Sequence, residues 1–413
     1  MNMRIPLVLA LVLIALSVLI DIYITRDVRK STRRDVWWKG YLVSAVLCWI
    51  FIIVVLCLPK RSESSGIIPV MWMLYSYLSF YASKLVYVVV SLVGRLLRRV
   101  CGFRVKWHPA QWVGFFAALG VLAMMWVGIV FTRRNIVVND VVISSPKIPV
   151  AFNGYTIAQI SDLHVGTWGN DTTFISTLVD SVNSLHPDLI VFTGDIVNRK
   201  TDELAPFKGV LSRLKAKDGV LSILGNHDYG DYVDWSSPDD RTANNLLLAQ
   251  NQAQMGWTLM NNERRFISRG NDSIMVIGVE NWGDPPFPVY GDLEKALSSS
   301  VDSIYHQNDR RFKILLTHNP EHWNQIVSHT TNIDLSLAGH THAMQMMLQF
   351  GKWKWSPARY RYDQWGGLYE RLNDNGQLSR LYVNIGAGEV GMPSRLLSAY
   401  PEITLLTLRH QGN

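Results

Sequence analysis

Long apolar runs dominate the first third of the chain. One run fills residues 5–20 apart from Ser17 and continues over 22–24, and three others occupy 41–58, 67–93 and 112–131. A helix needs about 20 apolar residues, at 1.5 Å each, to cross the hydrocarbon layer. The pattern therefore predicts about four transmembrane helices, over residues 5–24, 41–58, 67–93 and 112–131, in a membrane domain of residues 1–134.

The run at 67–93 is interrupted by Lys84, with Ser76, Ser79 and Ser83 nearby. A lysine near the end of a span can extend its side chain to the membrane surface, and this interpretation is favoured. The alternative is a functional charge inside the membrane. If this segment does not cross, the chain crosses three times and the C-terminal domain changes sides.

Lysine and arginine in short loops predict the orientation of the membrane domain. Six lie between the first two runs and five between the last two, against five on the opposite side. This bias places the two basic loops in the cytoplasm. With four spans, an integral membrane protein of the inner or plasma membrane with an extracytoplasmic C-terminal domain is expected.

The pattern changes after Gly154, where short apolar strands alternate with helically spaced segments. Strands are predicted at 155–160, 188–193 and 219–224, with helices at 174–185 and 204–215 between them. Later strands are more closely spaced, at 266–268, 274–279, 314–316, 335–338, 381–385 and 403–408. This order predicts an α/β domain over residues 135–413, with two sheets packed as a sandwich and flanked by helices.

The net charge of +7 suggests nucleic-acid binding until it is divided along the chain. Residues 1–134 carry 17 Lys and Arg against 4 acids, whereas residues 135–413 carry 23 against 29. The excess of basic residues therefore belongs to the membrane part, and no nucleic-acid partner is expected. The three cysteines all lie before residue 102, which excludes a disulfide framework or a thiolate zinc site in the C-terminal domain.

Five predicted strands end in polar side chains able to bind metals. They are followed by Asp162-x-His164, Gly194-Asp195, Asn226-His227-Asp228, Thr317-His318 and Gly339-His340-x-His342. Ligands of α/β sheets bind beyond the carboxyl ends of the strands, where such segments converge. Carboxylate, amide and imidazole ligands suit Mn²⁺, Fe²⁺ or Zn²⁺. Any one of these motifs is common by chance, but five in this order are not.

In this order the motifs resemble those of the calcineurin-like metallophosphoesterase superfamily, over residues 150–410. The segment 187–195 and Pro401-Glu402-Ile403 are similar to its membrane-associated bacterial branch. The resemblance implies two divalent metal ions. Asp162, His164 and His342 would hold one ion and Asn226, His318 and His340 the other, with Asp195 bridging them. It also implies that His227 acts beside the scissile phosphate and that Asp228 orients it.

The activity implied is that of a membrane-anchored dinuclear-metal phosphohydrolase, which cleaves a phosphoester or phosphoanhydride by attack of a metal-bound hydroxide. Its expected partners are the lipid bilayer and a phosphorylated substrate, lipid-linked or from the cell envelope. One alternative resembles the UDP-diacylglucosamine pyrophosphatases, whose substrate would require a cytoplasmic domain. Another is a non-catalytic membrane sensor or scaffold with a metal-stabilised domain. The sequence predicts no oligomeric state.

Aromatic and basic residues alternate over 344–371, directly after His340 and His342. This stretch is interpreted either as a substrate or headgroup loop, with arginines holding phosphate, or as a packed hairpin or membrane-interface belt. The candidate substrate-binding residues are Arg359, Tyr360, Arg361 and Arg395.

Overall fold

The computed structural model describes residues 7–31, 34–58, 67–102, 109–285, 287–297, 310–374 and 376–412. The chain forms two compact units. The first comprises residues 2–130 with 391–394, and the second comprises residues 131–390 with 395–413. Each unit is considered by itself below.

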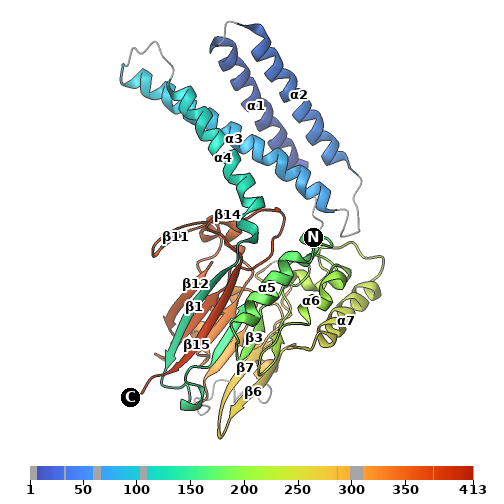
Figure 1. The fold of residues 1–413 in the computed structure, drawn as a ribbon, viewed down its shortest axis with the longest axis vertical. Coiled ribbons are helices and arrows are strands. Elements are labelled where there is room, and N and C mark those ends of the chain that lie inside the picture. The colour runs from blue at the N-terminus through green and yellow to red at the C-terminus, as the bar shows by residue number, and fades with distance from the viewer. Residues whose placement is uncertain are drawn as a thin grey trace. The chain divides into compact units, whose positions relative to one another are not determined.

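Four long helices make up the N-terminal unit: α1 (Leu7–Ser31), α2 (Asp35–Cys57), α3 (Ile67–Val100) and α4 (Pro109–Val130) (Figure 1). Among the described residues, three segments are long and apolar enough to cross a membrane: Asp35–Cys57, Ile68–Val100 and Pro109–Arg134. α1 is a fourth long helix, so the predicted count of about four is approximate.

The basic loops used to predict orientation lie partly outside the described residues. Residues 4, 33, 60, 61, 104 and 106 are among those not described. Arg26, Arg29 and Lys30 lie within α1, and Arg95, Arg98 and Arg99 lie within α3. The orientation therefore remains a prediction.

Asp21 of α1 is fully buried among donors from two other helices. It accepts hydrogen bonds from the Tyr41 hydroxyl, from Trp49 Nε1 at 2.9 Å, from the Tyr81 hydroxyl at 2.6 Å and from Lys84 Nζ at 2.9 Å. The Lys84 side chain is 18% exposed. The favoured interpretation of Lys84 is thus corrected, because its ammonium group pairs inside the helical unit with a carboxylate 63 residues earlier.

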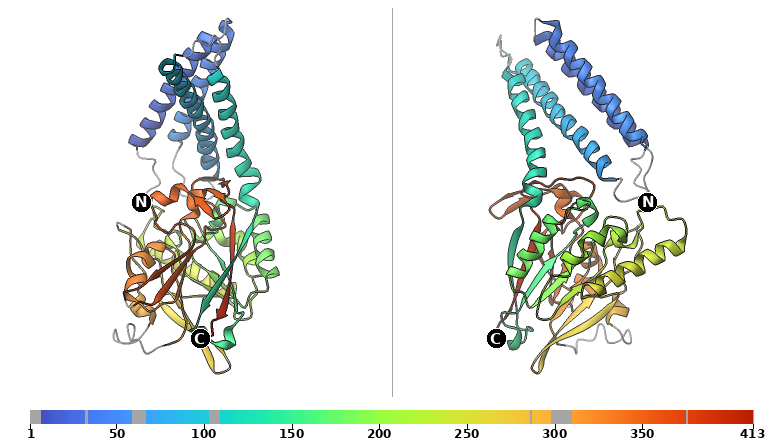
Figure 2. Two further views of the ribbon diagram at one scale, coloured as in Figure 1. Left: turned by 90° about the vertical axis from the view of Figure 1, so that its left-hand side faces the viewer. Right: turned by 45° about the vertical axis from the view of Figure 1, so that its right-hand side comes forward.

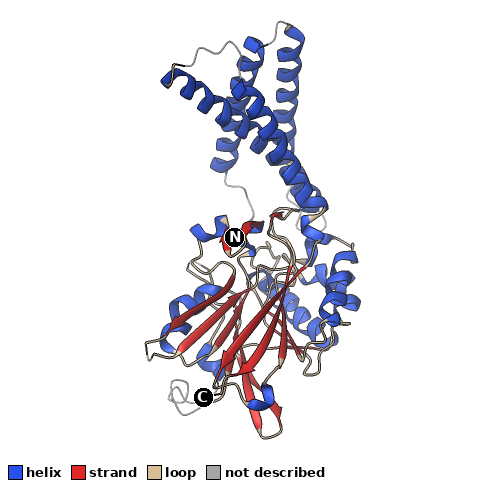
Figure 3. Ribbon diagram, turned by 60° about the vertical axis from the view of Figure 1, so that its left-hand side comes forward, coloured by secondary structure: helices blue, strands red, loops and turns tan. Residues whose placement is uncertain are grey.

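Two six-stranded sheets form the core of the C-terminal unit (Figure 3). The first sheet has the order β1 (Val137–Ser145), β15 (Glu402–His410), β2 (Thr156–Ile160), β3 (Leu189–Phe192), β4 (Val220–Ser222) and β5 (Trp257–Leu259). The second has the order β12 (Gly367–Leu372), β13 (Leu378–Val383), β9 (Leu335–Ala338), β8 (Lys313–Leu316), β7 (Asp272–Gly278) and β6 (Glu263–Arg269). Both sheets are mixed, with runs of parallel strands at their centres.

Alternating side chains of the strands divide the core into layers. In β3, Leu189 and Val191 join the cluster between the sheets, whereas Ile190 and Phe192 join the cluster beneath α5 (Thr173–Ser184). This follows from the two-residue period of a strand, since both faces of the sheet are covered. Both views of Figure 2 show α5 and α7 (Pro238–Gln254) on the outside of this unit. The predicted sandwich flanked by helices is confirmed.

One predicted helix differs from the structure. Residues 204–215 were expected to form one amphipathic helix, but a 3₁₀ segment η5 (Thr201–Phe207) precedes a single turn, α6 (Lys208–Leu211). Pro206 lies at this junction, and proline has no N–H to continue a helical ladder. The remaining short helices are η2 (Thr132–Arg134), η3 (Val150–Phe152), η4 (Val165–Trp168), η6 (Asn226–Tyr229), α8 (Leu293–Leu297), α10 (Pro320–His322), η7 (Trp323–Val327), α11 (Ser328–Thr330), η8 (His342–Gln345) and η9 (Pro357–Tyr360).

A third, three-stranded sheet follows the last histidine motif. Its order is β11 (Trp353–Trp355), β10 (Met346–Phe350) and β14 (Leu396–Leu397). β10 and β11 form an antiparallel hairpin, and β14 pairs with β10 in parallel. The aromatic and basic stretch therefore contains a real hairpin, as one of its two interpretations expected.

Candidate metal centre

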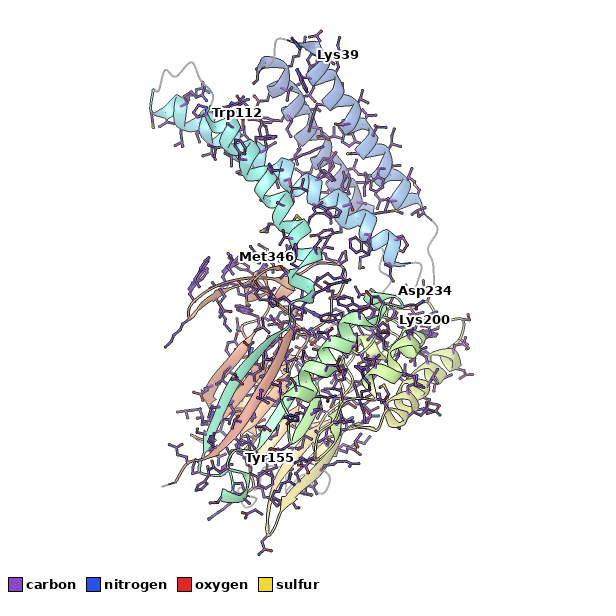
Figure 4. The ribbon with its side chains drawn as sticks, in the orientation of Figure 1. Lys39, Trp112, Tyr155, Lys200, Asp234 and Met346 are labelled. Carbon is purple, nitrogen blue, oxygen red and sulfur yellow. The ribbon has the colours of Figure 1, made fainter. Side chains whose placement is uncertain are left out.

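The polar side chains that end five strands come together at one edge of the sandwich. Asp162 and His164 follow β2, Asp195 follows β3, and His318 follows β8. Residues 226–228 form η6 after β4, and residues 340 and 342 follow β9. The site is therefore built from the carboxyl ends of strands in both sheets, as expected. Figure 4 labels Tyr155, just before β2, and Met346, the first residue of β10, which lie well apart in this unit.

Asp162, His164 and His342 form the first group of candidate ligands. All three are buried, and their ligand atoms lie within 4.8 Å of one another. The Nε2 atoms of His164 and His342 are 3.0 Å apart, and His342 Nε2 is 3.3 Å from Asp162 Oδ1. Two ring nitrogens and a carboxylate oxygen therefore point at the same small volume.

Asp195, His318 and His340 form the second group. His318 Nε2 lies 3.1 Å from Asp195 Oδ2 and 3.2 Å from His340 Nδ1. Asn226 Oδ1 is 3.1 Å from His318 Nε2, so the predicted amide ligand also reaches this group. Asp195 Oδ2 is in addition 3.5 Å from His164 Nε2, which places this carboxylate between the two groups.

The backbone at the candidate ligands is held in an uncommon conformation. Five of them have positive φ: Asp162 (53°), His164 (43°), Asp195 (61°), His340 (76°) and His342 (50°). Left-handed backbone at non-glycine residues costs free energy and concentrates at functional sites, where surrounding structure enforces it. Here the turn after each strand aims the side chain back across the sheet edge.

Two glycines allow these turns to approach one another. A Cβ added at Gly225 would lie 2.2 Å from Asp195 Oδ1, and one at Gly339 would lie 2.3 Å from Asp162 Oδ2. No side chain fits at such separations. Glycine at both positions is therefore required for the two carboxylates to sit against the neighbouring strand ends.

Hydrogen bonds on the outer ring nitrogens fix which nitrogen of each histidine faces inward. His318 Nδ1 lies 2.7 Å from the Thr193 carbonyl, so it carries the proton and leaves Nε2 facing the site. His340 Nε2 lies 3.1 Å from the Tyr362 hydroxyl and leaves Nδ1 facing inward. Such outer partners orient the histidine ligands of metal sites.

The charges of the centre are strongly coupled. Burial alone would raise the pKa of Asp162, but His342 and His318 hold it below its usual value. Burial likewise opposes the charge of Asp195, yet His318 and His227 hold its pKa well below the usual value. Burial is outweighed at His318, where Asp195 raises the pKa to about 9, whereas burial and His318 lower the pKa of His340 to about 3. The buried carboxylates are therefore anionic and attract positive charge.

This donor set fits divalent cations. Two anionic carboxylates, an amide oxygen and four imidazoles gather in buried positions, with ring nitrogens 3.0 and 3.2 Å from each other. Facing nitrogen lone pairs need a proton or a cation between them. Imidazole and carboxylate ligands suit Mn²⁺, Fe²⁺ and Zn²⁺, and the donors do not distinguish among these ions.

His227 and Asp228 lie beside the two groups, but not as a pair. The His227 ring is 4.8 Å from that of His164, and its Nδ1 lies 2.7 Å from the Asn198 carbonyl. Asp228 instead accepts bonds from the backbone N–H groups of residues 195, 196, 197 and 225, at 2.8 to 3.2 Å. The expected orientation of His227 by Asp228 is therefore corrected. Asp228 ties the turn after β3 to the turn after β4, and burial beside Asp195 raises its pKa to about 7.

The four candidate substrate residues do not form one cluster. Arg359 and Tyr360 are exposed, and Tyr360 is 79% accessible. Arg361 binds Asp284 Oδ2 at 2.6 Å, which links its segment to the loop that contains residues 284 and 285.

Arg395 is fully buried and is not available to a substrate. Its guanidinium group donates to the carbonyls of Gly388, Ile385 and Ala399, and NH2 lies 3.4 Å from His342 Nδ1. The predicted substrate contact is therefore corrected, because Arg395 braces the turn behind a candidate ligand.

Three residues at the rim of the centre were not singled out from the sequence. Tyr362 contacts His340, Asn198 contacts His227, and Tyr232 stacks at 4.4 Å on His227 while its hydroxyl accepts from Asn226 Nδ2 at 2.7 Å. Lys200 and Asp234, labelled in Figure 4, lie in the same unit, and Lys200 Nζ is 5.5 Å from the centroid of the Trp235 ring. No spacing links these positions to the histidine motifs.

A cavity of about 420 Å³ lies elsewhere in this unit. It is lined from β1 by Val137 and Asn139, from the β10–β11 hairpin by Met347, Gln349 and Lys354, and by residues of the last strands. None of the nine candidate metal and catalytic residues lines it. This cavity is therefore separate from the candidate metal centre.

Comparison with known proteins agrees with this geometry. The calcineurin-like phosphoesterase family matches residues 155–344, and the family described as "Probable Calcineurin-like phosphoesterase, transmembrane domain" matches residues 3–133. The uncharacterized metallophosphoesterase YkuE of Bacillus subtilis is 32% identical over 271 residues, which cover 65% of this chain and 83% of that protein.

Two further relatives come from distant organisms. A transmembrane protein with metallophosphoesterase domain of Danio rerio is 29% identical over 303 residues, covering 71% of this chain and 62% of that protein. The UDP-2,3-diacylglucosamine pyrophosphatase LpxG of Chlamydia trachomatis is 28% identical over 298 residues, covering 63% of this chain and 85% of that protein. With its strand-end histidines and aspartates and its apolar N-terminal helices, the chain belongs to the calcineurin-like metallophosphoesterase family, as a membrane-associated member.

Proposed function

We propose that this protein is a dinuclear-metal phosphohydrolase whose catalytic domain comprises residues 135–413 and whose membrane domain comprises residues 1–134. One observation carries the proposal: two buried ligand groups meet at Asp195, whose Oδ2 lies within 3.5 Å of a histidine from each. Asp162, His164 and His342 would hold one divalent ion and Asn226, His318 and His340 the other. Asp195 would bridge them.

Bound divalent ions would supply Lewis acidity, which polarises phosphoryl oxygens and lowers the pKa of water. The protein's own residues hold the candidate ligands in position for that chemistry. The carbonyl of Thr193 and the hydroxyl of Tyr362 hold the outer nitrogens of His318 and His340, so their inner nitrogens face the site without rearrangement. Asp228 locks the two turns that carry Asp195 and Asn226 by accepting backbone hydrogen bonds from both.

His227 is proposed as the catalytic acid. Its Nδ1 proton is held by the Asn198 carbonyl, which leaves Nε2 as the nitrogen that can exchange a proton with the leaving oxygen of the substrate. The ring packs between those of His164 and Tyr232, so its position is fixed. Removing the ring would therefore remove proton donation without removing a ligand.

The proposed substrate is a phosphoester or phosphoanhydride of a lipid or of the cell envelope. The fusion to transmembrane helices supports this, because an anchored enzyme meets substrates that stay in the membrane. The similarity to a UDP-2,3-diacylglucosamine pyrophosphatase supports a second candidate, a pyrophosphate bond between a nucleotide and a lipid. The two candidates differ in topology, since the loop charges favour an extracytoplasmic domain and a nucleotide-linked substrate requires a cytoplasmic one. A reporter fused after Asn413 would distinguish these two orientations.

The test is hydrolysis of bis(p-nitrophenyl) phosphate by the full-length protein with Mn²⁺, followed by a panel of phospholipids and nucleotide-linked lipids. Turnover should be abolished by chelator and restored by metal. The variant His227→Ala should lose about 10² to 10⁴-fold in turnover while retaining both metals. His329→Ala, at an exposed histidine, is the matched control. Near-normal turnover of His227→Ala would refute its role, and metal binding without any hydrolysis would favour the sensor or scaffold.

A further inference from the structure

The β10–β11 hairpin and the turn after it expose several large apolar side chains. Phe350 is 70% accessible, Trp353 is 53% accessible and Tyr360 is 79% accessible. The rings of Phe350 and Trp353 stack on each other at 6.1 Å, and those of Trp355 and Tyr360 meet edge-on at 6.5 Å. A contiguous exposed group of aromatic rings on a soluble domain usually marks an interaction surface.

The same segment carries only positive charge. Residues 344–361 include Lys352, Lys354, Arg359 and Arg361, and they contain no aspartate or glutamate. Lys352, Lys354 and Arg359 are exposed. Aromatic side chains interleaved with lysine suit the headgroup layer of an anionic bilayer, where the rings lie among the lipid glycerols and the cations among phosphates.

The hairpin is linked through β14 to η2, the segment that directly follows α4 in the chain. The candidate span Pro109–Arg134 ends in η2, and η2 packs beside β14. β14 pairs with β10, which is the first strand of the hairpin. The end of the span and the aromatic hairpin therefore belong to neighbouring parts of one small structure within the C-terminal unit.

The junction at η2 is firmly attached to the catalytic domain. Arg133 is buried, its Nε lies 3.1 Å from Glu389 Oε1, and its guanidinium group stacks 4.2 Å from the ring of Trp168. Glu389 accepts the Thr167 hydroxyl on its carbonyl oxygen. η2 and the hairpin are consequently held together within the C-terminal unit.

The exposed segment also lies close to the metal centre along the chain. Two residues after Tyr360, the hydroxyl of Tyr362 lies 3.1 Å from His340 Nε2. Arg361 between them is anchored by Asp284. The segment that carries the exposed cations therefore also supplies a side chain, Tyr362, that contacts a candidate metal ligand.

We propose that Phe350, Lys352, Trp353 and Tyr360 form an interfacial surface that lies in the headgroup layer of an anionic lipid bilayer. The inference goes beyond the proposed function, because it assigns a membrane contact in addition to the transmembrane helices. It explains why aromatic and basic residues are exposed together without acids. The other possible occupant, the same surface on a second copy of the chain, is distinguished by the test below.

The first experiment uses full-length protein in nanodiscs of phosphatidylcholine and phosphatidylglycerol. Cys48, Cys57 and Cys101 are replaced by serine, and an environment-sensitive fluorophore is attached at Trp353→Cys. Leu246→Cys is the control, because Leu246 is 60% exposed on α7 of the same unit. Spin-labelled lipids should quench the probe at 353 at least about threefold more than the probe at 246. Equal quenching overturns the proposal, as does protection at 353 that depends on two protein copies per disc.

The second experiment measures what the contact does. The double variant Phe350→Asp with Trp353→Asp should lose about tenfold in kcat/KM toward a bilayer-embedded phosphorylated lipid, while hydrolysis of soluble bis(p-nitrophenyl) phosphate is unchanged. Phe266→Asp is the matched control, since Phe266 is a partly exposed aromatic on β6. Equal losses on both substrates, or no loss on either, contradict the proposal. If the wild type hydrolyses neither substrate, the proposed function fails, and the quenching experiment still tests the surface independently.

Discussion

Both units of the protein bury aspartates, and the surroundings of Asp21 and Asp27 differ from those of Asp162 and Asp195. In the helical unit, Asp21 accepts from two tyrosines, a tryptophan and Lys84, and Asp27 accepts from Tyr87, Arg95 and Gln111. In the catalytic unit, Asp162 and Asp195 face histidine nitrogens that also lie 3.0 to 3.2 Å from one another.

The contrast separates a structural carboxylate from a ligand. Tyrosine, tryptophan, lysine, arginine and glutamine side chains donate hydrogen bonds. They therefore complete the hydrogen bonding of Asp21 and Asp27 and hold the helices together. Imidazoles can present lone pairs, and several of them around one carboxylate leave negative potential for a cation to neutralise. Burial and acidity are thus common to both clusters, and the chemistry of the neighbours decides the function.

The strongest test of the contrast is Asp195→Ala. Loss of a carboxylate that reaches both ligand groups should lower activity by at least about 10³-fold, since losing only an outer-shell partner already costs about 10- to 100-fold. Metal content of the purified variant, measured by elemental analysis, should fall below that of the wild type. Full metal occupancy would refute the bridging role.

Asp21→Leu should act on stability and leave metal content unchanged. It leaves the Lys84 ammonium without its buried partner and should destabilise the helical unit by about 3 kcal/mol, as measured by unfolding in detergent micelles. Asp21→Leu combined with Lys84→Met is the matched control, because it removes both charges and should recover part of that loss. If Asp21→Leu is fully folded and yet has lost metal, the conclusion that Asp21 is structural and independent of the metal centre is wrong.

A buried histidine outside the centre sharpens the contrast. His322 lies 3.0 Å from the Thr317 hydroxyl through Nδ1, and burial lowers its pKa to about 4. The unfolded chain would bind this proton below about pH 6.5 and the folded chain would not, so stability falls as pH drops from 6.5 toward 4. The loss at pH 5 relative to pH 8 is about 2 kcal/mol.

His322→Phe should therefore reduce the acid sensitivity of unfolding while activity at pH 8 is retained. Denaturant titrations of both proteins at pH 8 and pH 5 measure this difference. Identical pH dependence in the two proteins would show that His322 does not carry the effect.

The smallest expected effect is that of Tyr362→Phe. Removing one hydroxyl from His340 Nε2 should weaken metal affinity by about tenfold, through loss of ring orientation, with little change in kcat at saturating metal. Titration of the metal-free protein with Mn²⁺, followed by activity, measures it. Tyr360→Phe is the matched control, because that residue lies two positions away and is exposed. A change in kcat without a change in metal requirement would mean that Tyr362 acts on the substrate instead.

Much of the fold could be predicted because its strands are short, buried and regularly spaced. The strand at 335–338 was predicted with the bounds that the structure has. The strand predicted at 155–160 differs by one residue at its start, and the strand predicted at 188–193 differs by one residue at each end. α7 was missed, since its sequence is polar and has few buried residues: Leu248, Asn251 and Gln252. Asp239 and Asp240 lie in its first turn, where Ser237 caps the helix.

The candidate ligands could be predicted for a different reason. Each lies in a motif that follows an apolar strand, so the order of the motifs along the chain indicated the candidate side chains. The resemblance to the calcineurin-like family then implied which of them are ligands: Asp162, His164, Asp195, Asn226, His318, His340 and His342. Their neighbours could not be selected in this way. Tyr362 lies inside the aromatic and basic stretch and contacts His340, whereas Arg395 lies outside that stretch and is buried behind His342.

The sequence by itself determined which residue types end each strand and that apolar helices precede them, because hydrophobic periodicity and motif spacing are local properties. Only the tertiary structure decided which donors meet. Lys84 pairs with Asp21, 63 residues earlier, and Arg133 pairs with Glu389 near the other end of the catalytic domain. Asp228 accepts hydrogen bonds from backbone turns and does not orient His227. Such contacts join segments that are far apart in the sequence, so local sequence patterns do not reveal them.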